Sequence, residues 1–257
     1  MKVAIITYST YGHINTLAKS IQQGVIESKL ADTVDIFQVQ ETLSDNVLQM
    51  INAPPKDSEI PIADSESLTK YDAFLFGCPT RYGNAPAQFS AFFDATGGLW
   101  AQGALQGKPA GFFVSTGTLG GGQEVTIRNM LSFLVHHGMI YVPTGYAAFE
   151  DMANMEEVHG GSPYGAGTFA GADGSRQPSD LEKRIAKVQG ETFAKTASKL
   201  SVKPAEEPTK EEPKKEQAET ANKRTEQSTK TPEVQEKSGC AKCIIICTEV
   251  FARSSTG

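Results

Sequence analysis

Six consecutive residues near the start of the chain combine hydroxyl groups, an imidazole and a glycine in an order suited to holding an anion. They are Ser9, Thr10, Tyr11, Gly12, His13 and Ile14. An apolar run precedes them and an amphipathic segment follows, and a strand that turns into a helix aims free backbone N–H groups and the positive end of the helix dipole at one point. The segment therefore predicts a phosphate site; a Ser/Thr-rich turn without a ligand is the alternative.

Two further segments rich in Gly, Ser, Thr and Asn come directly after predicted strands, at residues 79–84 and 115–122. Because the carboxyl ends of parallel strands lie at one edge of a sheet, we expect these segments to converge with residues 9–14. Together they could hold a cofactor that carries a phosphate and a planar polar ring. Arg81 would then place positive charge beside an electron-rich ring and favour its reduced, anionic state. A surface ion pair is the alternative role for this arginine.

The elements that must position these segments alternate along the first part of the chain. Apolar runs predict strands at residues 3–8, 34–39, 71–77, 110–115 and 139–142. Helical periodicity predicts helices at 14–30, 85–96 and 122–137, and the capping box Ser179-x-x-Glu182 opens a last helix. Residues 41–70 read as irregular, and Trp100 is placed in a loop. Strands alternating with helices predict an α/β fold, with a doubly wound parallel sheet covered by helices on both faces.

The bulk properties of the sequence exclude several classes of protein. Its 257 residues carry a formal net charge of −6, which argues against general nucleic-acid binding. No secretory signal opens the sequence and no apolar run is long enough to span a membrane, so we expect a reducing, cytoplasmic compartment. Cys78 follows a buried strand and reads as an inert core thiol. No metal site is expected, since His13 and His159 lack a second ligand at a suitable spacing.

The composition of the sequence changes after residue 200. Residues 201–239 are dominated by Lys, Glu, Pro, Thr and Gln and contain no aromatic residue. Such a segment cannot bury enough apolar surface to offset the entropy lost on ordering. We therefore expect a folded domain at 1–200, a disordered charged linker at 201–239 and a cysteine-rich segment at 240–257.

Three cysteines in that last segment flank three isoleucines: Cys240, Cys243 and Cys247. A metal site would lack a fourth ligand and a folded scaffold. S-acylation fits better, and two or more acyl chains would anchor the chain to a membrane. Prenylation is disfavoured because the chain continues past the motif. An anchor of this kind would hold a cytoplasmic protein on the cytosolic face of the plasma membrane; an unmodified tail is the alternative.

Several motifs, in register over about residues 1–200, resemble the WrbA family of flavodoxin-like, FMN-dependent NAD(P)H:quinone oxidoreductases. They are residues 9–14, 80–84, 96–100, 115–123, 136–139, 160–166 and 171–178. The charged tail with terminal cysteines is similar to fungal membrane-associated members. The resemblance implies a flavodoxin-like sheet of five strands in the order 2-1-3-4-5. It also implies a homo-oligomer, either a dimer or a tetramer.

The same resemblance implies roles for individual residues. The FMN phosphate would bind at Ser9, Thr10, Tyr11, Gly12, His13 and Ile14. The isoalloxazine ring would lie against Thr80, Arg81, Tyr82, Ser115, Thr116, Gly117, Thr118, Leu119 and Gly120. Arg81 and His136 would be the catalytic residues, with His136 contributed by the same or a neighbouring subunit. Tyr11 would contact the nicotinamide nucleotide, and Trp100 would face the quinone or pack against a neighbouring subunit.

One departure from the family pattern concerns the loop after the fourth strand. Leu119 is an extra residue there, which alters the contacts expected after Thr118. The predicted function is two-electron reduction of quinones by NADH or NADPH through FMN, in oxidative-stress defence. A non-catalytic, membrane-tethered scaffold or stress regulator on the same fold is the alternative. A one-electron carrier is a third reading, but such carriers usually present a more strongly acidic docking face.

Overall fold

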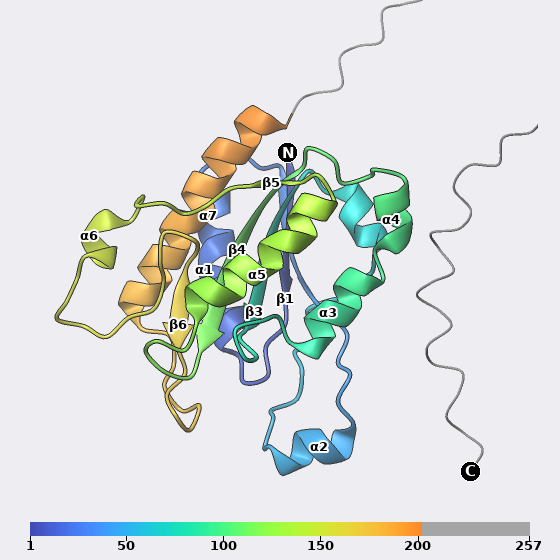
Figure 1. Ribbon diagram of the computed structural model, residues 1–257. Coiled ribbons are helices and arrows are strands. Elements are labelled where there is room, and N and C mark those ends of the chain that lie inside the picture. Colours follow the sequence, from blue (N-terminus) through green and yellow to red (C-terminus); the bar gives the residue numbers. More distant parts are fainter. Residues whose placement is uncertain (202–257) are drawn as a thin grey trace, which may run out of the picture. The chain divides into compact units, whose positions relative to one another are not determined.

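The structure is a computed structural model that describes residues 1–201 (Figure 1). All but the first residue of the predicted linker 201–239 lies outside the described residues. So does the segment 240–257, and with it the predictions made for Cys240, Cys243 and Cys247. Within the described residues, none of the helices has the length and apolar character needed to cross a membrane.

A parallel sheet forms the centre of the protein, and its strands follow the order β2-β1-β3-β4-β5. These strands are β1 (Lys2–Thr7), β2 (Thr33–Gln38), β3 (Ala73–Pro79), β4 (Pro109–Thr116) and β5 (Ile140–Tyr141). The predicted order is confirmed. The prediction lacks one short strand, β6 (Gly167–Phe169), which pairs in parallel with the carboxyl end of β4, whereas β5 pairs with the amino end of β4.

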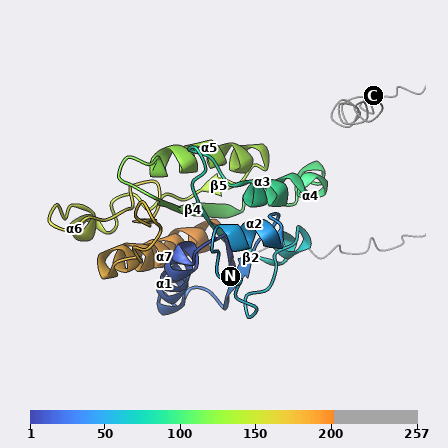
Figure 2. The ribbon, with the colours of Figure 1, turned by 90° about the horizontal axis from the view of Figure 1, so that it is seen from below.

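Helices cover both faces of this sheet, as predicted (Figure 2). On one face lie α1 (His13–Glu27) and α7 (Asp180–Leu200). On the other face lie α3 (Ala87–Asp94), α4 (Gly97–Ala101) and α5 (Gln123–His136). Shorter elements sit in the connections: α2 (Asp45–Met50), the 3-10 helix η1 (Glu66–Lys70) and α6 (Phe149–Met152). The predicted capping box forms at the start of α7, between Ser179 and Glu182.

Each face of the sheet has its own apolar core. On the first face, Ile14, Leu17 and Ile21 of α1 belong to one buried cluster with Ile185 and Phe193 of α7. On the second face, the ring of Phe76 in β3 packs against a set of aromatic rings with centroids 5.7–6.2 Å away, those of Phe89, Phe93, Phe112 and Phe133. Burying apolar surface on both faces fixes the register of the strands, and with it the positions of the loops at the edge of the sheet.

The two helices on the first face approach each other closely at two glycines. A Cβ atom on Gly24 of α1 would overlap the backbone oxygen of Lys187, and one on Gly190 of α7 would overlap that of Ile21. This contact holds α7 directly over α1, whose first turn forms part of the candidate site.

Two local predictions are wrong. Residues 41–70, expected to be irregular, contain α2 and η1, and Trp100, expected in a loop, lies in α4. Both α2 and α4 are short and bury no residue, so they lack the apolar periodicity by which a helix is found in a sequence. Cys78 is fully buried, as predicted, and burial raises the pKa of its thiol.

Candidate functional site

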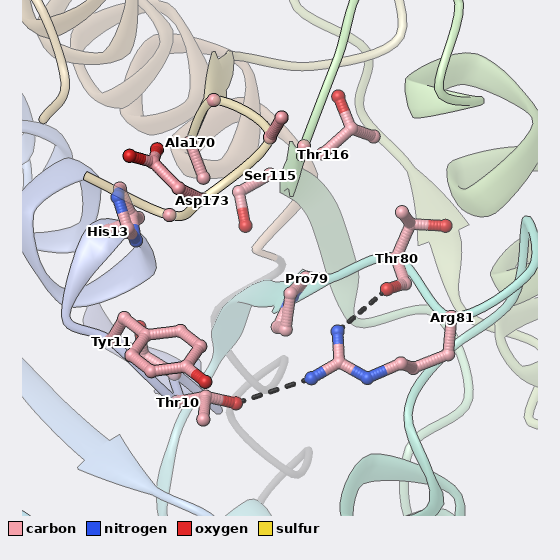
Figure 3. Close-up of a pocket in the computed structure, with 15 residues that line it drawn as sticks. Thr10, Tyr11, His13, Pro79, Thr80, Arg81, Ser115, Thr116, Ala170 and Asp173 are labelled. Carbon is pink, nitrogen blue, oxygen red and sulfur yellow. Dashed lines mark hydrogen bonds between the residues drawn. The ribbon is translucent and has the colours of Figure 1, made fainter. Parts of the chain in front are cut away.

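The three polar segments predicted to converge do meet, at the carboxyl edge of β1, β3 and β4. They surround a cavity of about 280 Å³ (Figure 3). The predicted site residues that line it are Ser9, Thr10, Tyr11, His13, Thr80, Arg81, Ser115, Thr116 and Gly117. The place of the cavity could be predicted from the sequence, because the loops that follow parallel strands all lie at the same edge of the sheet.

The segment between β1 and α1 brings the uncapped start of a helix to the edge of this cavity, which His13 of the first turn lines, whereas Gly12 lines a neighbouring hollow. Gly12 occupies the N-cap position with a φ of 90° and offers no side chain to the first-turn N–H groups. Ile14 is buried in the core, and its N–H donates to Oγ of Ser9 at 3.2 Å. The first turn of α1 contains no acidic residue. An anion would therefore meet free N–H donors and an unopposed helix dipole, so a phosphate group fits this turn.

Tyr11 and His13 of the same turn differ in their exposure and in the segments that they contact. Tyr11 is partly exposed at the cavity, and its hydroxyl donates to the backbone oxygen of Ile51 at 2.9 Å. His13 is buried, and its Nε2 lies 2.8 Å from the backbone oxygen of Arg176. Because a carbonyl oxygen only accepts, Nε2 carries the proton in this contact. The ring of His13 is thus held by the chain beyond β6 and not by the turn itself.

The guanidinium of Arg81 extends across the cavity mouth (Figure 3). Nη1 donates to the backbone oxygen of Thr80 at 2.8 Å, and Nη2 donates to Oγ1 of Thr10 at 3.3 Å. Within residues 1–201 Arg81 forms no ion pair, so the surface ion pair weighed against its site role is not seen there. Its charge is available to a ligand that enters the cavity.

A tight turn presents Arg81 at this position. The N–H of Arg81 donates to the backbone oxygen of Asn84 at 2.8 Å, and the N–H of Asn84 donates back at 2.9 Å. Tyr82 and Gly83, between them, have φ values of 53° and 75°, the pattern of a type I′ turn. Positive φ is strained for tyrosine, and the turn leaves the Tyr82 side chain fully exposed and outside the cavity lining.

Helix α5 anchors that turn from behind. Thr126 donates its hydroxyl to Oγ1 of Thr80 at 2.7 Å, and Asn129 donates its amide to the backbone oxygen of Gly83 at 2.8 Å. Thr80 in turn accepts from the N–H of Gly83 at 3.1 Å. The position of Arg81 is therefore fixed by the packed helix and not by the loop alone.

The loop after β4 turns away from the cavity earlier than predicted. Ser115, Thr116 and Gly117 line the cavity, but Thr118, Leu119 and Gly120 do not. Oγ1 of Thr116 donates to the backbone oxygen of Thr118 at 3.1 Å, which bends the chain outward, and Leu119 is left 67% exposed. The extra residue Leu119 thus occupies the outside of the loop.

A fourth wall of the cavity was not included in the predicted site. Residues 170–174, between β6 and α7, line it through Ala170, Gly171, Ala172, Asp173 and Gly174. Arg176 holds this wall in place: Nη1 donates to Oε2 of the fully buried Glu182 at 2.9 Å and to the backbone oxygen of Phe169 at 2.7 Å. The signal that could have found this wall is a glycine-rich polar run after a short apolar stretch, the same pattern as in the other loops.

Two further predicted residues, His136 and Trp100, also lie outside the cavity lining in this chain. His136 ends α5, a helix of 14 residues whose start is at the cavity edge of the sheet, so His136 lies about 20 Å along the helix axis from that start. Trp100 is in α4 and is 59% exposed. Neither belongs to the cavity lining.

A part-buried polar cluster lies next to the turn and contacts it through Lys56, which donates to the backbone oxygen of Ser9. The hydroxyl of Tyr8 donates to Oε2 of Glu41 at 3.0 Å, and burial raises the pKa of Tyr8 to about 12. Burial would also raise the pKa of Glu41, but hydrogen bonds from the N–H of Leu43 and from the Lys56 and Gln88 side chains lower it to about 2. Glu41 is therefore ionised at neutral pH.

Comparison with known proteins identifies the family of the chain. Residues 1–154 match the family of NADPH-dependent FMN reductases. The chain belongs to that family. It is 53% identical to the NAD(P)H quinone oxidoreductase YCP4 of Candida albicans, over 96% of this chain and all of that protein. It is 62% identical to the NAD(P)H quinone oxidoreductase PST3 of the same organism, over 77% of this chain and 98% of that protein.

Solved structures agree on the fold of this family member. A WrbA-like flavodoxin from Agrobacterium tumefaciens aligns with a TM-score of 0.54 at 18% identity, covering 77% of this chain and 98% of that one. The resemblance drawn from the motifs is thus confirmed by the family, by the relatives and by the fold. Of the two relatives above, YCP4 alone also aligns with most of the chain beyond residue 200, since PST3 covers only 77% of it.

Proposed function

We infer that this chain is an FMN-dependent NAD(P)H:quinone oxidoreductase, which reduces quinones by two electrons. The observation that carries this conclusion is the cavity at the carboxyl edge of the sheet, where an uncapped helix start and a guanidinium lie on the loops of neighbouring strands. The family and the names of the relatives support the same reaction. A formed cavity of this kind favours an enzyme over a non-catalytic scaffold.

The residues of the cavity suit the parts of FMN. The first-turn N–H groups after Ser9 would hold the phosphate, and the loops at Thr80 and Ser115 would hold the ring. When bound, FMN supplies the redox chemistry, accepting a hydride from NAD(P)H and passing two electrons to a quinone. The protein orients the ring, keeps one face open to the substrates and places the charge of Arg81 beside it. That charge favours the reduced, anionic ring.

Activity of the purified full-length chain tests this conclusion. With FMN added, the protein should oxidise NADH or NADPH only when a quinone such as benzoquinone is present. It should consume one nucleotide for each quinone reduced. Arg81→Met should lower turnover at saturating nucleotide. A chain that binds FMN but shows no quinone-dependent oxidation of either nucleotide would contradict the proposal.

We propose that the active form is a homo-oligomer in which His136 and Trp100 reach the cavity of a neighbouring chain. Support comes from their position: both are exposed, and both lie away from the cavity of their own chain. Mixing the variants Arg81→Met and His136→Ala tests this directly. If the sites are shared, mixed oligomers should be more active than either variant alone, because some sites then combine an intact Arg81 with an intact His136. No recovery after verified subunit exchange would contradict the proposal.

We also propose that the C-terminal cysteines are S-acylated and hold the protein on the cytosolic face of the plasma membrane, where quinone reduction would serve in oxidative-stress defence. The spacing of Cys240, Cys243 and Cys247 around three isoleucines supports this. Palmitate labelling that hydroxylamine removes, and that a triple Cys→Ser variant lacks, is expected. Absence of such labelling from the wild type would contradict the anchor.

A further inference from the structure

A second hollow, of about 260 Å³, lies behind the turn that begins α1, between that turn and residues 54–57. Lys56 lines it, with 29% of its side chain exposed. Its Nζ donates to the backbone oxygen of Ser9 at 2.8 Å. An ammonium group is therefore bonded directly to the backbone of the segment that would bind the FMN phosphate.

The geometry of a peptide unit decides what this contact does. The oxygen of Ser9 and the N–H of Thr10 belong to one planar trans peptide, so they point in opposite directions. With Lys56 on the oxygen, the N–H of Thr10 is directed away from Lys56. Thr10 lies between the two hollows, because it lines both this one and the cavity at the carboxyl edge of the sheet. A cation on the carbonyl polarises the peptide and makes its N–H a stronger donor.

The ammonium group is held in place without any ligand. Nζ of Lys56 lies 3.0 Å from Oε2 of Glu41 and 4.3 Å from the centroid of the Tyr8 ring. Glu41 is fixed in turn, because Gln88 donates to its Oε1 at 2.7 Å. The arrangement is preorganised, so little entropy would be lost at Lys56 when an anion binds on the far side of the turn.

We propose that Lys56 is a positioning residue for the FMN phosphate, which orients the Ser9–Thr10 peptide and supplies positive charge from behind the turn. The inference rests on FMN being the cofactor, as proposed above. Residues 9–14 contain no Lys or Arg, so the turn has no permanent charge of its own. The guanidinium of Arg81 contacts the side-chain hydroxyl of Thr10, whereas Lys56 contacts the backbone of the turn.

The experiment compares FMN with riboflavin, which lacks the phosphate, in titrations of the full-length protein after its flavin has been removed. Lys56→Met should weaken FMN binding about tenfold, the usual size for a lost charged hydrogen bond. The same variant should change riboflavin binding less than about twofold. Equal weakening of both flavins, or no change in either, would overturn the proposal.

Two further variants keep the test decisive even if Lys56→Met folds poorly. Lys56→Arg keeps the charge, so its ratio of FMN to riboflavin affinity should stay within about twofold of the wild type. Lys19→Met removes an exposed lysine from the same hollow without touching the Ser9 carbonyl, so its ratio should also stay near that of the wild type. The proposal would be overturned if Lys56→Arg lowered the ratio of FMN to riboflavin affinity as much as Lys56→Met does. It would also be overturned if Lys19→Met and Lys56→Met lost equal FMN affinity. A wild type that binds neither flavin would instead overturn the function on which it rests.

Discussion

Nη2 of Arg81 lies 3.3 Å from Oγ1 of Thr10, and this contact joins the loop after β3 to the loop after β1 across the mouth of the cavity. Because Thr10 lies in the turn that would bind the phosphate, the guanidinium links that end of the cavity to the end proposed for the ring. The Tyr82–Gly83 turn and α5 hold it there from behind. The charge at this position is therefore part of the folded scaffold.

Replacing Arg81 should change the reduction potential of bound FMN. Arg81→Met removes the positive charge that favours the reduced, anionic ring, so the midpoint potential should fall by roughly 30 mV, equivalent to about 1.4 kcal/mol for two electrons. The midpoint potential of Arg81→Lys should fall less, because this variant keeps the charge. Anaerobic titration against a reference dye measures both variants. A potential equal to that of the wild type in Arg81→Met would rule out this role.

Replacing Gly12 should destabilise the start of α1 through the backbone alone. Its φ is 90°, and no atom lies within 4 Å of an added Cβ. Gly12→Ala should therefore cost about 1–2 kcal/mol of unfolding free energy through the left-handed conformation, and weaken FMN binding as the turn shifts. Gly98→Ala in α4 is the control, since its added Cβ also has no atom within 4 Å and its φ is not in the left-handed region. Urea unfolding compares them; equal stability of the two variants would refute the strain argument.

Replacing Gly190 should disturb the contact between α1 and α7 by steric overlap. The new Cβ of Gly190→Ala would meet the backbone oxygen of Ile21, so the helices must separate, at a cost of about 1–3 kcal/mol. Thr196→Ala, at an exposed position on the same helix, should be neutral or slightly stabilising. Thermal unfolding of the two variants measures the difference. A Gly190→Ala variant as stable as Thr196→Ala would show that the helices are not in close contact there.

Glu41 should make the stability of the protein depend on acid pH. Its pKa is about 2 in the folded state against 4.5 ordinarily, so its contribution is fully present above about pH 4.5. As pH falls from there towards about 2, that contribution, about 3 kcal/mol at most, is lost. Glu41→Gln should therefore flatten the dependence of unfolding free energy on pH over that window. Parallel curves for wild type and variant would show that Glu41 is not the group responsible.

The sequence was sufficient to predict the sheet order, because long apolar runs alternate with amphipathic helices and the family motifs lie in register. It also located the cavity, since three polar loops must meet at one edge. It could not place residues 170–174, whose position depends on the pairing of the three-residue strand β6 with β4. Nor could it find the contact of Lys56 with Ser9, two residues 47 positions apart that are joined only by the tertiary fold.

The place of His136 within the chain could not be predicted from the rule that located the other site residues. Loops that follow parallel strands lie at the carboxyl edge of the sheet, and this places their residues. His136 is not in such a loop, because α5 runs from that edge and carries His136 away from it. Leu119 illustrates a different limit, because its insertion is visible in the sequence but the bend at Thr116, which turns it outward, is not. Such details follow from individual hydrogen bonds that no periodicity encodes.

FMN bound in this cavity should pass two electrons from a nicotinamide nucleotide to a quinone. Anaerobic absorbance of the FMN-loaded protein tests it most directly, with NADH or NADPH added first and benzoquinone second. One nucleotide per bound FMN should bleach the flavin band, and one benzoquinone should restore it fully. A bound flavin that neither nucleotide bleaches would contradict it.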